Sequence, residues 1–114
     1  MSDLKRICDF LKECKVYYIA TTEGDQPRVR PFATVNIFED KLYIQTGKSK
    51  NVFHQIHHNP KVELCGCLGD KWIRIAGTLV EDDRKEPQET MLDAYPALKA
   101  AYHAGDGNTV VLYL

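Results

Sequence analysis

The sequence has no long apolar run, almost no net charge and no repeated or low-complexity segment. Its uninterrupted apolar stretches are only a few residues long, so we expect no membrane span, no signal peptide and a cytoplasmic protein. The formal charge is −1 at pH 7, and the basic residues form no long run. A general role in nucleic-acid binding is therefore disfavoured.

Common catalytic motifs are also missing. The sequence has no G-x-S-x-G elbow, no catalytic-cysteine signature and no paired-histidine metal motif, so we expect no catalytic side chain. Cys65 and Cys67 lie on one predicted strand near His57 and His58, but C-x-C with adjacent histidines lacks the usual spacing of zinc ligands. We expect no metal, and four reduced thiols, since neither cysteine pair suits a disulfide. Cys65 and Cys67 are interpreted as small thiols buried on a core strand.

At 114 residues and 44% apolar composition, the chain predicts a single globular domain spanning residues 1–114. Periodicity and turn residues predict an α+β fold with about six antiparallel strands and short flanking helices. The expected strands cover residues 16–22, 28–38, 41–46, 61–68, 71–80 and 109–114. The last has no polar alternation and is expected to be internal. A helix with an apolar stripe that includes Leu11 is expected near the N-terminus, another over 50–58, one from the acidic run 81–83 to about 94, and a further helical turn from 96 to 102. Glu39 and Asp40 are expected to form the turn between the second and third strands.

The stretch from Gln26 to Ile56 is the best candidate for a functional site. In residues 28–38 the odd positions are apolar, which predicts that they are buried and that Arg28 and Arg30 share the opposite face. The following loop ends at Ser49, an expected helix N-cap, and a helix start with nearby cations suits a phosphate monoester. A solvated basic edge strand is an equally open interpretation.

The expected strand over residues 71–80 places Trp72, Arg74, Ala76 and Thr78 on one face. An indole beside a guanidinium suits a planar ring with a polar edge, but a tryptophan in a dimer interface explains the pattern equally well. Gly77 indicates a bulge or a close backbone approach. The acidic residues 81–83 are expected to cap the next helix.

Four segments carry a resemblance to a known family: PRVRPF, KLYIQTGKSKNVFHQI, NPKVELCG and KWIRIAGTLVEDD. Over residues 11–114 the chain resembles the small pyridoxamine 5′-phosphate oxidase-like flavoproteins, the FMN-binding split β-barrel family, including general-stress and nitroimidazole-reductase-like members. The resemblance implies a split β-barrel with FMN at a homodimer interface. It does not extend to the C-terminal arginine- and histidine-bearing substrate segment of true pyridoxamine phosphate oxidases, so the vitamin substrate is not expected.

The resemblance also implies which residues contact FMN. Near the ring and ribityl chain it places Arg28, Val29, Arg30 and Pro31, near the phosphate Thr46, Ser49, Lys50 and Asn51, and near the ring from the partner subunit Trp72. The leading hypothesis is a dimeric FMN-dependent oxidoreductase acting on a small molecule, since a flavin supplies its own redox chemistry. The alternative is a non-catalytic protein that binds a flavin or another phosphate ligand.

Overall fold

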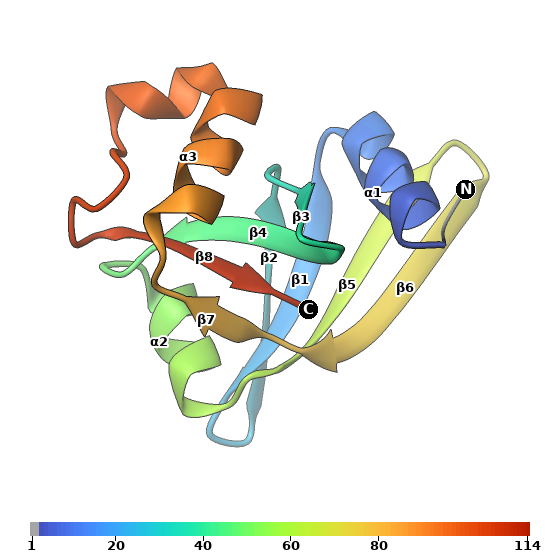
Figure 1. Ribbon diagram of the computed structural model, residues 1–114. Helices are drawn as coiled ribbons and strands as arrows, with labels where there is room; N and C mark the ends of the chain where they lie inside the picture. Colours follow the sequence, from blue (N-terminus) through green and yellow to red (C-terminus); the bar gives the residue numbers. More distant parts are fainter. Residues whose placement is uncertain (1–2) are drawn as a thin grey trace.

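A computed structural model describes residues 3–114, which form eight strands in two four-stranded antiparallel sheets. In Figure 1 the strands of the two sheets run in different directions and enclose a common core. The first sheet has the order β2 (Gln26–Phe32), β1 (Tyr17–Glu23), β5 (Lys61–Leu68), β6 (Lys71–Thr78). The second has the order β3 (Asn36–Phe38), β4 (Lys41–Gly47), β8 (Thr109–Tyr113), β7 (Val80–Asp82). The expected α+β split barrel is confirmed.

The expected number of about six strands is wrong, because two predicted strands are each divided where the chain passes from the first sheet to the second. Residues 28–38 are divided between β2 and β3, and residues 71–80 between β6 and β7. At each crossing, backbone N–H and C=O groups form hydrogen bonds with partners outside the strand ladders. The N–H and C=O of Val35 both bond to the hydroxyl of Tyr95, and the N–H of Leu79 donates to the carbonyl of Pro60.

The core lies between the inner faces of the two sheets. Ile19 and Leu64 of the first sheet pack there with Ile44 and Leu112 of the second, all almost fully buried. Helix α1 (Asp3–Cys14) covers this core with the predicted apolar stripe that includes Leu11. Helix α2 (Asn51–His58), at the lower left in Figure 1, contributes buried side chains to the same core.

The outer face of the second sheet is covered by helix α3 (Lys85–Ala94), which is followed by the short 3-10 helix η1 (Pro96–Ala100). Met91 of α3 packs there with Tyr43 and Val111. Strand β8 is thus buried on both faces and lies between β4 and β7, so the prediction of an internal final strand is confirmed. None of the helices in residues 3–114 has the length and apolar content needed to cross a bilayer.

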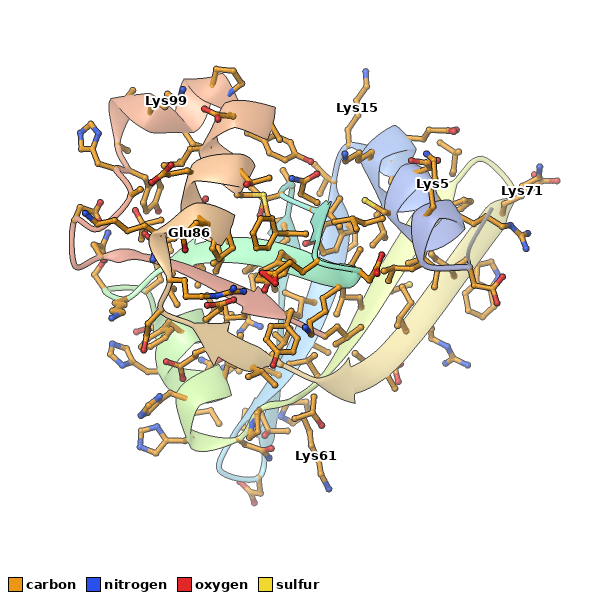
Figure 2. The ribbon with its side chains drawn as sticks, in the orientation of Figure 1. Lys5, Lys15, Lys61, Lys71, Glu86 and Lys99 are labelled. Atoms are coloured by element: carbon orange, nitrogen blue, oxygen red, sulfur yellow. The ribbon has the colours of Figure 1, made fainter. Side chains whose placement is uncertain are left out.

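The outer face of the first sheet is open. Figure 2 shows Lys61 and Lys71 at opposite ends of its β5–β6 hairpin. Large apolar side chains on this face are exposed: Tyr18 by 48%, Val29 by 68% and Trp72 by 58%. The predicted burial of Val29 is therefore wrong.

The register explains the reversal. Arg28 and Arg30 do share a face, as expected, but they pair with Thr21 and Ile19, whose side chains are buried. The arginines therefore lie on the core side of this edge strand, and Val29 faces outward. Polar partners at the rim of the barrel, described below, make this inward direction favourable for Arg30.

Three other local expectations are wrong. Helix α2 begins after Lys50 rather than after Ser49, and no side chain caps it. Asp82 lies in β7 and is buried, and α3 begins after Arg84, so the acidic run does not cap the helix. Cys67 is exposed on the outer face of β5 instead of buried. Alternation along β5 directs the Cys67 side chain away from the core, on the same face as Trp72, its partner residue in β6.

Candidate functional site

A cavity of about 240 Å³ opens where β2 and β4 meet α2 and the segment around η1. Its lining is formed by Arg30, Pro31, Phe32, Ala33, Thr34, Gln45, Thr46, Lys50, Val52, Leu98 and Tyr102. We call it the Arg30 cavity. Residues from both halves of the Gln26–Ile56 stretch meet here, because the segment between β2 and β3 runs beside β4, where Oγ1 of Thr34 bonds to the backbone N–H and C=O of Gln45.

Four of the nine residues expected at a cofactor site line this cavity: Arg30, Pro31, Thr46 and Lys50. The other five lie elsewhere. Arg28 forms an ion pair with Glu23 at 2.9 Å, whereas Val29 and Trp72 face outward from the first sheet. Asn51 and Ser49 are exposed, and the N–H of Ser49 is already bonded to another loop.

Arg30 is held by three hydrogen bonds at the rim of the core. Its Nη1 donates to the carbonyl of Ile19 and to Oγ1 of Thr21, and its Nη2 donates to Oε1 of Gln55. All three acceptors are uncharged, and burial, followed by the nearby charge of Arg28, lowers the pKa of Arg30 from its ordinary value. A guanidinium has five N–H donors, so two remain for another partner. An anion in the cavity would offset the cost of this partly desolvated charge.

Gln45 contributes a buried acceptor with no partner. Its backbone N–H donates to Oγ1 of Thr34 at 3.0 Å, but its side-chain Oε1 has no hydrogen bond within residues 3–114. An unsatisfied buried carbonyl oxygen costs about 1–3 kcal/mol. Gln45 lines the Arg30 cavity, but its Oε1 exposes less than 1 Å² to solvent, so a ligand in the cavity reaches this oxygen only if the side chain turns.

Lys50 stands at the start of α2, on the loop that follows β4. The loop is fixed by Asn108, whose carbonyl accepts from the N–H of Lys48 and whose Oδ1 accepts from that of Ser49. The side chain of Lys50 makes no hydrogen bond or ion pair within residues 3–114, and it is exposed at the cavity. It is thus available to an anionic ligand.

The loop around Asn108 is organised in turn by Asp106. Its carboxylate accepts from the N–H groups of His103, Asn108 and Thr109, and these bonds hold its pKa well below the ordinary value. Gly47 at the end of β4 suits this close approach, because a Cβ at that position would lie 3.1 Å from Nδ2 of Asn108 and 3.2 Å from the Tyr102 ring, so these side chains would have to shift.

Sequence reasoning missed Gln45, Leu98, Tyr102 and Asn108. The last three lie at least 50 positions after Lys48, in a segment whose sequence indicated only a helical turn followed by a break. In the sequence pattern, Gln45 cannot be distinguished from the other positions of the strand expected over residues 41–46. The G-D-G-N run was a detectable sign of a structured turn, but nothing local indicated which loop it would meet.

The cavity offers two cations together with hydroxyl and amide groups, and its lining contains no carboxylate and no imidazole. Such a set binds and orients a polar anion, but it does not provide a general acid or base with an ordinary pKa near neutrality.

Residues 4–114 match the protein family described as pyridoxamine 5′-phosphate oxidase. The chain belongs to this family. The resemblance found in the sequence is thereby confirmed.

Solved structures agree. A NimC/NimA family protein from Clostridium acetobutylicum is 49% identical, with a TM-score of 0.95 over 100% of this chain and 83% of that one. General Stress Protein 26 from Bacillus anthracis is 18% identical, with a TM-score of 0.79 over 100% of this chain and 88% of that one. A pyridoxamine 5′-phosphate oxidase-related, FMN-binding protein from Nostoc punctiforme is 16% identical, with a TM-score of 0.71 over 100% and 81%. The last two show the shared fold. No curated protein sequence matched the chain.

Proposed function

We propose that the chain binds FMN with the phosphate and ribityl chain in the Arg30 cavity. The observation that carries this proposal is the presence of two cations in one cavity, Arg30 with two unused N–H donors and Lys50 with no side-chain partner within residues 3–114, both available to the phosphate. Charge-assisted hydrogen bonds to a phosphate contribute roughly 1.5–3 kcal/mol each when water is excluded. Thr46 adds a hydroxyl beside these groups.

The size of the cavity supports partial enclosure of the nucleotide. Its volume of about 240 Å³ is below the roughly 300–1,000 Å³ of pockets that enclose a whole drug-sized ligand. We infer that the phosphate end is enclosed and that the flavin ring extends along Pro31 toward the outer face of the first sheet.

The outer face of the first sheet is the proposed homodimer interface. Tyr18, Val29 and Trp72 are exposed there on β1, β2 and β6, and Pro31, which lines the Arg30 cavity, lies on the same edge strand as Val29. An exposed sheet face that carries several large apolar side chains is typical of an interface, and a second copy related by a two-fold axis would cover both faces at once. The partner's Trp72 would then lie near the flavin ring.

The proposed activity is redox chemistry on a small molecule. Bound FMN supplies the hydride transfer, and the chain's own residues hold the phosphate, orient the ring and exclude water. NimC/NimA, flavin-binding and reductase proteins among the relatives support this choice. The non-catalytic alternative uses the same cavity and differs only in turnover.

Binding and turnover are tested separately. Apo-protein is titrated with FMN and with riboflavin, and the flavin fluorescence is followed; the proposal expects FMN to bind more tightly. Equal affinities of FMN and riboflavin would contradict the phosphate site.

For turnover, the FMN-loaded protein is reduced chemically without oxygen and mixed with a nitroaromatic compound, a quinone or oxygen. Reoxidation faster than that of free reduced FMN supports an oxidoreductase, and reoxidation no faster than that of free flavin supports the carrier.

A further inference from the structure

A second cavity, of about 470 Å³, lies between the β1–β2 turn and the outward side of α2. It is lined by Thr22, Glu23, Gly24, His54, Gln55, His58 and Asn59. We call it the His54 cavity. It shares no lining residue with the Arg30 cavity, although Gln55 in its lining also bonds to Arg30.

Gln55 supplies unused donors on the inner side of this cavity. The residue is only 8% exposed, and its Oε1 accepts hydrogen bonds from Oγ1 of Thr21 at 2.6 Å and from Nη2 of Arg30. Its Nε2 makes no hydrogen bond within residues 3–114. Because the Oε1 side of the amide is turned toward Arg30, the two N–H donors of Nε2 are left for the His54 cavity. Although the residue is buried, Nε2 itself is accessible to solvent, so these donors are open to a ligand in the cavity.

Acceptors stand on the outer side of the same cavity. Nδ1 of His58 lies 2.8 Å from the carbonyl of His54, so it carries the proton, and Nε2 of the neutral ring is an acceptor. Oε1 of Glu23 accepts both hydrogen bonds from Arg28, which leaves Oε2 as a second acceptor. The amide of Asn59 is already bonded to Thr22 through Nδ2 and to the N–H of Lys61 through Oδ1.

We propose that the His54 cavity binds a small planar molecule with a primary carboxamide group. The carboxamide oxygen accepts from Nε2 of Gln55, and its NH₂ donates to Nε2 of His58 or Oε2 of Glu23. The planar ring lies against the exposed imidazoles of His54 and His58. A carboxylate of the same shape binds more weakly, because it has no donor for the acceptors on His58 and Glu23.

Benzamide and benzoate are the probes, since they have the same shape and differ in the group that the site recognises. The ¹⁵N-labelled protein at about pH 8, above the ordinary pKa of imidazole, is titrated with each compound and followed by amide chemical shifts. Benzamide is expected to give saturable shifts at the Gln55 side-chain NH₂ and at the backbone amides of Gly24 and Asn59. Benzoate is expected to bind at least about tenfold more weakly.

Two variants distinguish this site from general surface binding. Gln55→Glu keeps a carboxylate oxygen for Thr21 and Arg30 but removes the N–H donors, and His58→Phe keeps a ring but removes the acceptor. Each is expected to weaken benzamide binding about tenfold. His103→Phe, which replaces a histidine outside the cavity, is the control and is expected to change nothing.

The labelled spectrum of each variant also shows whether it is folded, and His58 is exposed, so its replacement does not disturb the core. The proposal is overturned if benzamide gives no saturable shift. Equal binding of benzoate, or unchanged affinity in both Gln55→Glu and His58→Phe, overturns it as well. None of these outcomes depends on flavin binding in the Arg30 cavity.

Discussion

Asn108 accepts a hydrogen bond from the backbone N–H of Ser49, over 3.1 Å between Oδ1 and N, across 59 positions of sequence. Its carbonyl also accepts from the N–H of Lys48 at 2.8 Å. Two successive N–H groups that could have faced a phosphate are thereby turned toward the protein. The loop is thus held in place by the chain itself, and the cations are left to provide the electrostatic attraction to an anion.

Replacing Asn108 with alanine is expected to weaken FMN binding by about 1–2 kcal/mol, which corresponds to roughly one decade in dissociation constant. The loop that carries Lys50 would lose one fixed point, so riboflavin, which lacks the phosphate, should be affected less. Flavin fluorescence titrations of the variant with both ligands give the comparison. Asn59→Ala, which removes an asparagine bonded elsewhere, should leave the ratio of the two affinities unchanged. An equal loss for both flavins would show that Asn108 supports the fold rather than the loop.

Lys50→Ala is expected to weaken FMN by about 1.5–3 kcal/mol, or one to two decades in dissociation constant, and riboflavin far less. The removed ammonium lines the Arg30 cavity and has no other side-chain partner within residues 3–114. Lys48→Ala is the matched control, because that lysine lies two positions away on the same exposed loop but outside the cavity lining. The same titrations measure both. Similar losses in the two variants would indicate a diffuse basic patch instead of a phosphate site.

Helices, strands and turns could be predicted from the sequence wherever they depend only on the pattern of neighbouring residues. The Glu39–Asp40 turn has positive φ at both residues, as a tight hairpin requires, and the helix pattern around Leu11 packs as expected. What could not be predicted is where a strand leaves one sheet for the other. Val35 is an ordinary apolar residue in the pattern, and only the hydroxyl of Tyr95, 60 positions later, makes the break at that residue favourable.

The site was predicted in part for the same reason. Alternation showed that Arg28 and Arg30 share a face, but periodicity alone cannot say which face is the inner one. Arg30 is directed to the cavity by Thr21 and Gln55, and Arg28 is held outside it by Glu23. These partners come from other elements, so two arginines that are equivalent in the pattern have different roles in the fold.

Trp72→Glu is expected to convert the proposed dimer to a monomer, because a charge on the open face of the first sheet would have to be desolvated in the interface. Sedimentation at micromolar concentration measures the change. Since Trp72 is the only tryptophan, its fluorescence in the unmodified protein should also shift to longer wavelength on dilution. Val80→Glu adds the same charge at an exposed apolar residue of the second sheet and should leave the dimer intact. A monomeric unmodified protein would contradict the proposed interface.

Stability at acid pH should depend on Asp82, which joins β7 to the start of α3. Hydrogen bonds from Arg84, and then one from Tyr43 at 2.7 Å, hold the pKa of Asp82 well below its ordinary value. A depressed folded-state pKa means that the unfolded state binds the proton more readily, so this stabilisation is present above the ordinary aspartate pKa and is lost as the pH falls below it. The free energy of unfolding should therefore fall with pH below about 4.

Asp82→Asn isolates this contribution. The variant is expected to lose about 2 kcal/mol of the free energy of unfolding at neutral pH, because the Asp82 side chain is only 7% exposed and charged hydrogen bonds of this kind contribute about 1.5–3 kcal/mol. The difference from the unmodified protein should narrow as the pH falls below about 4, where the aspartate begins to be protonated. Urea unfolding at a series of pH values measures it. The control is Asp93→Asn, which removes the exposed pair between Asp93 of α3 and Lys99 of η1 and should cost less than about 1 kcal/mol at every pH. Lys99 is labelled in Figure 2. A difference for Asp82→Asn that stays constant from neutral to acid pH would mean that the carboxylate charge contributes nothing and that only the shape of the side chain matters.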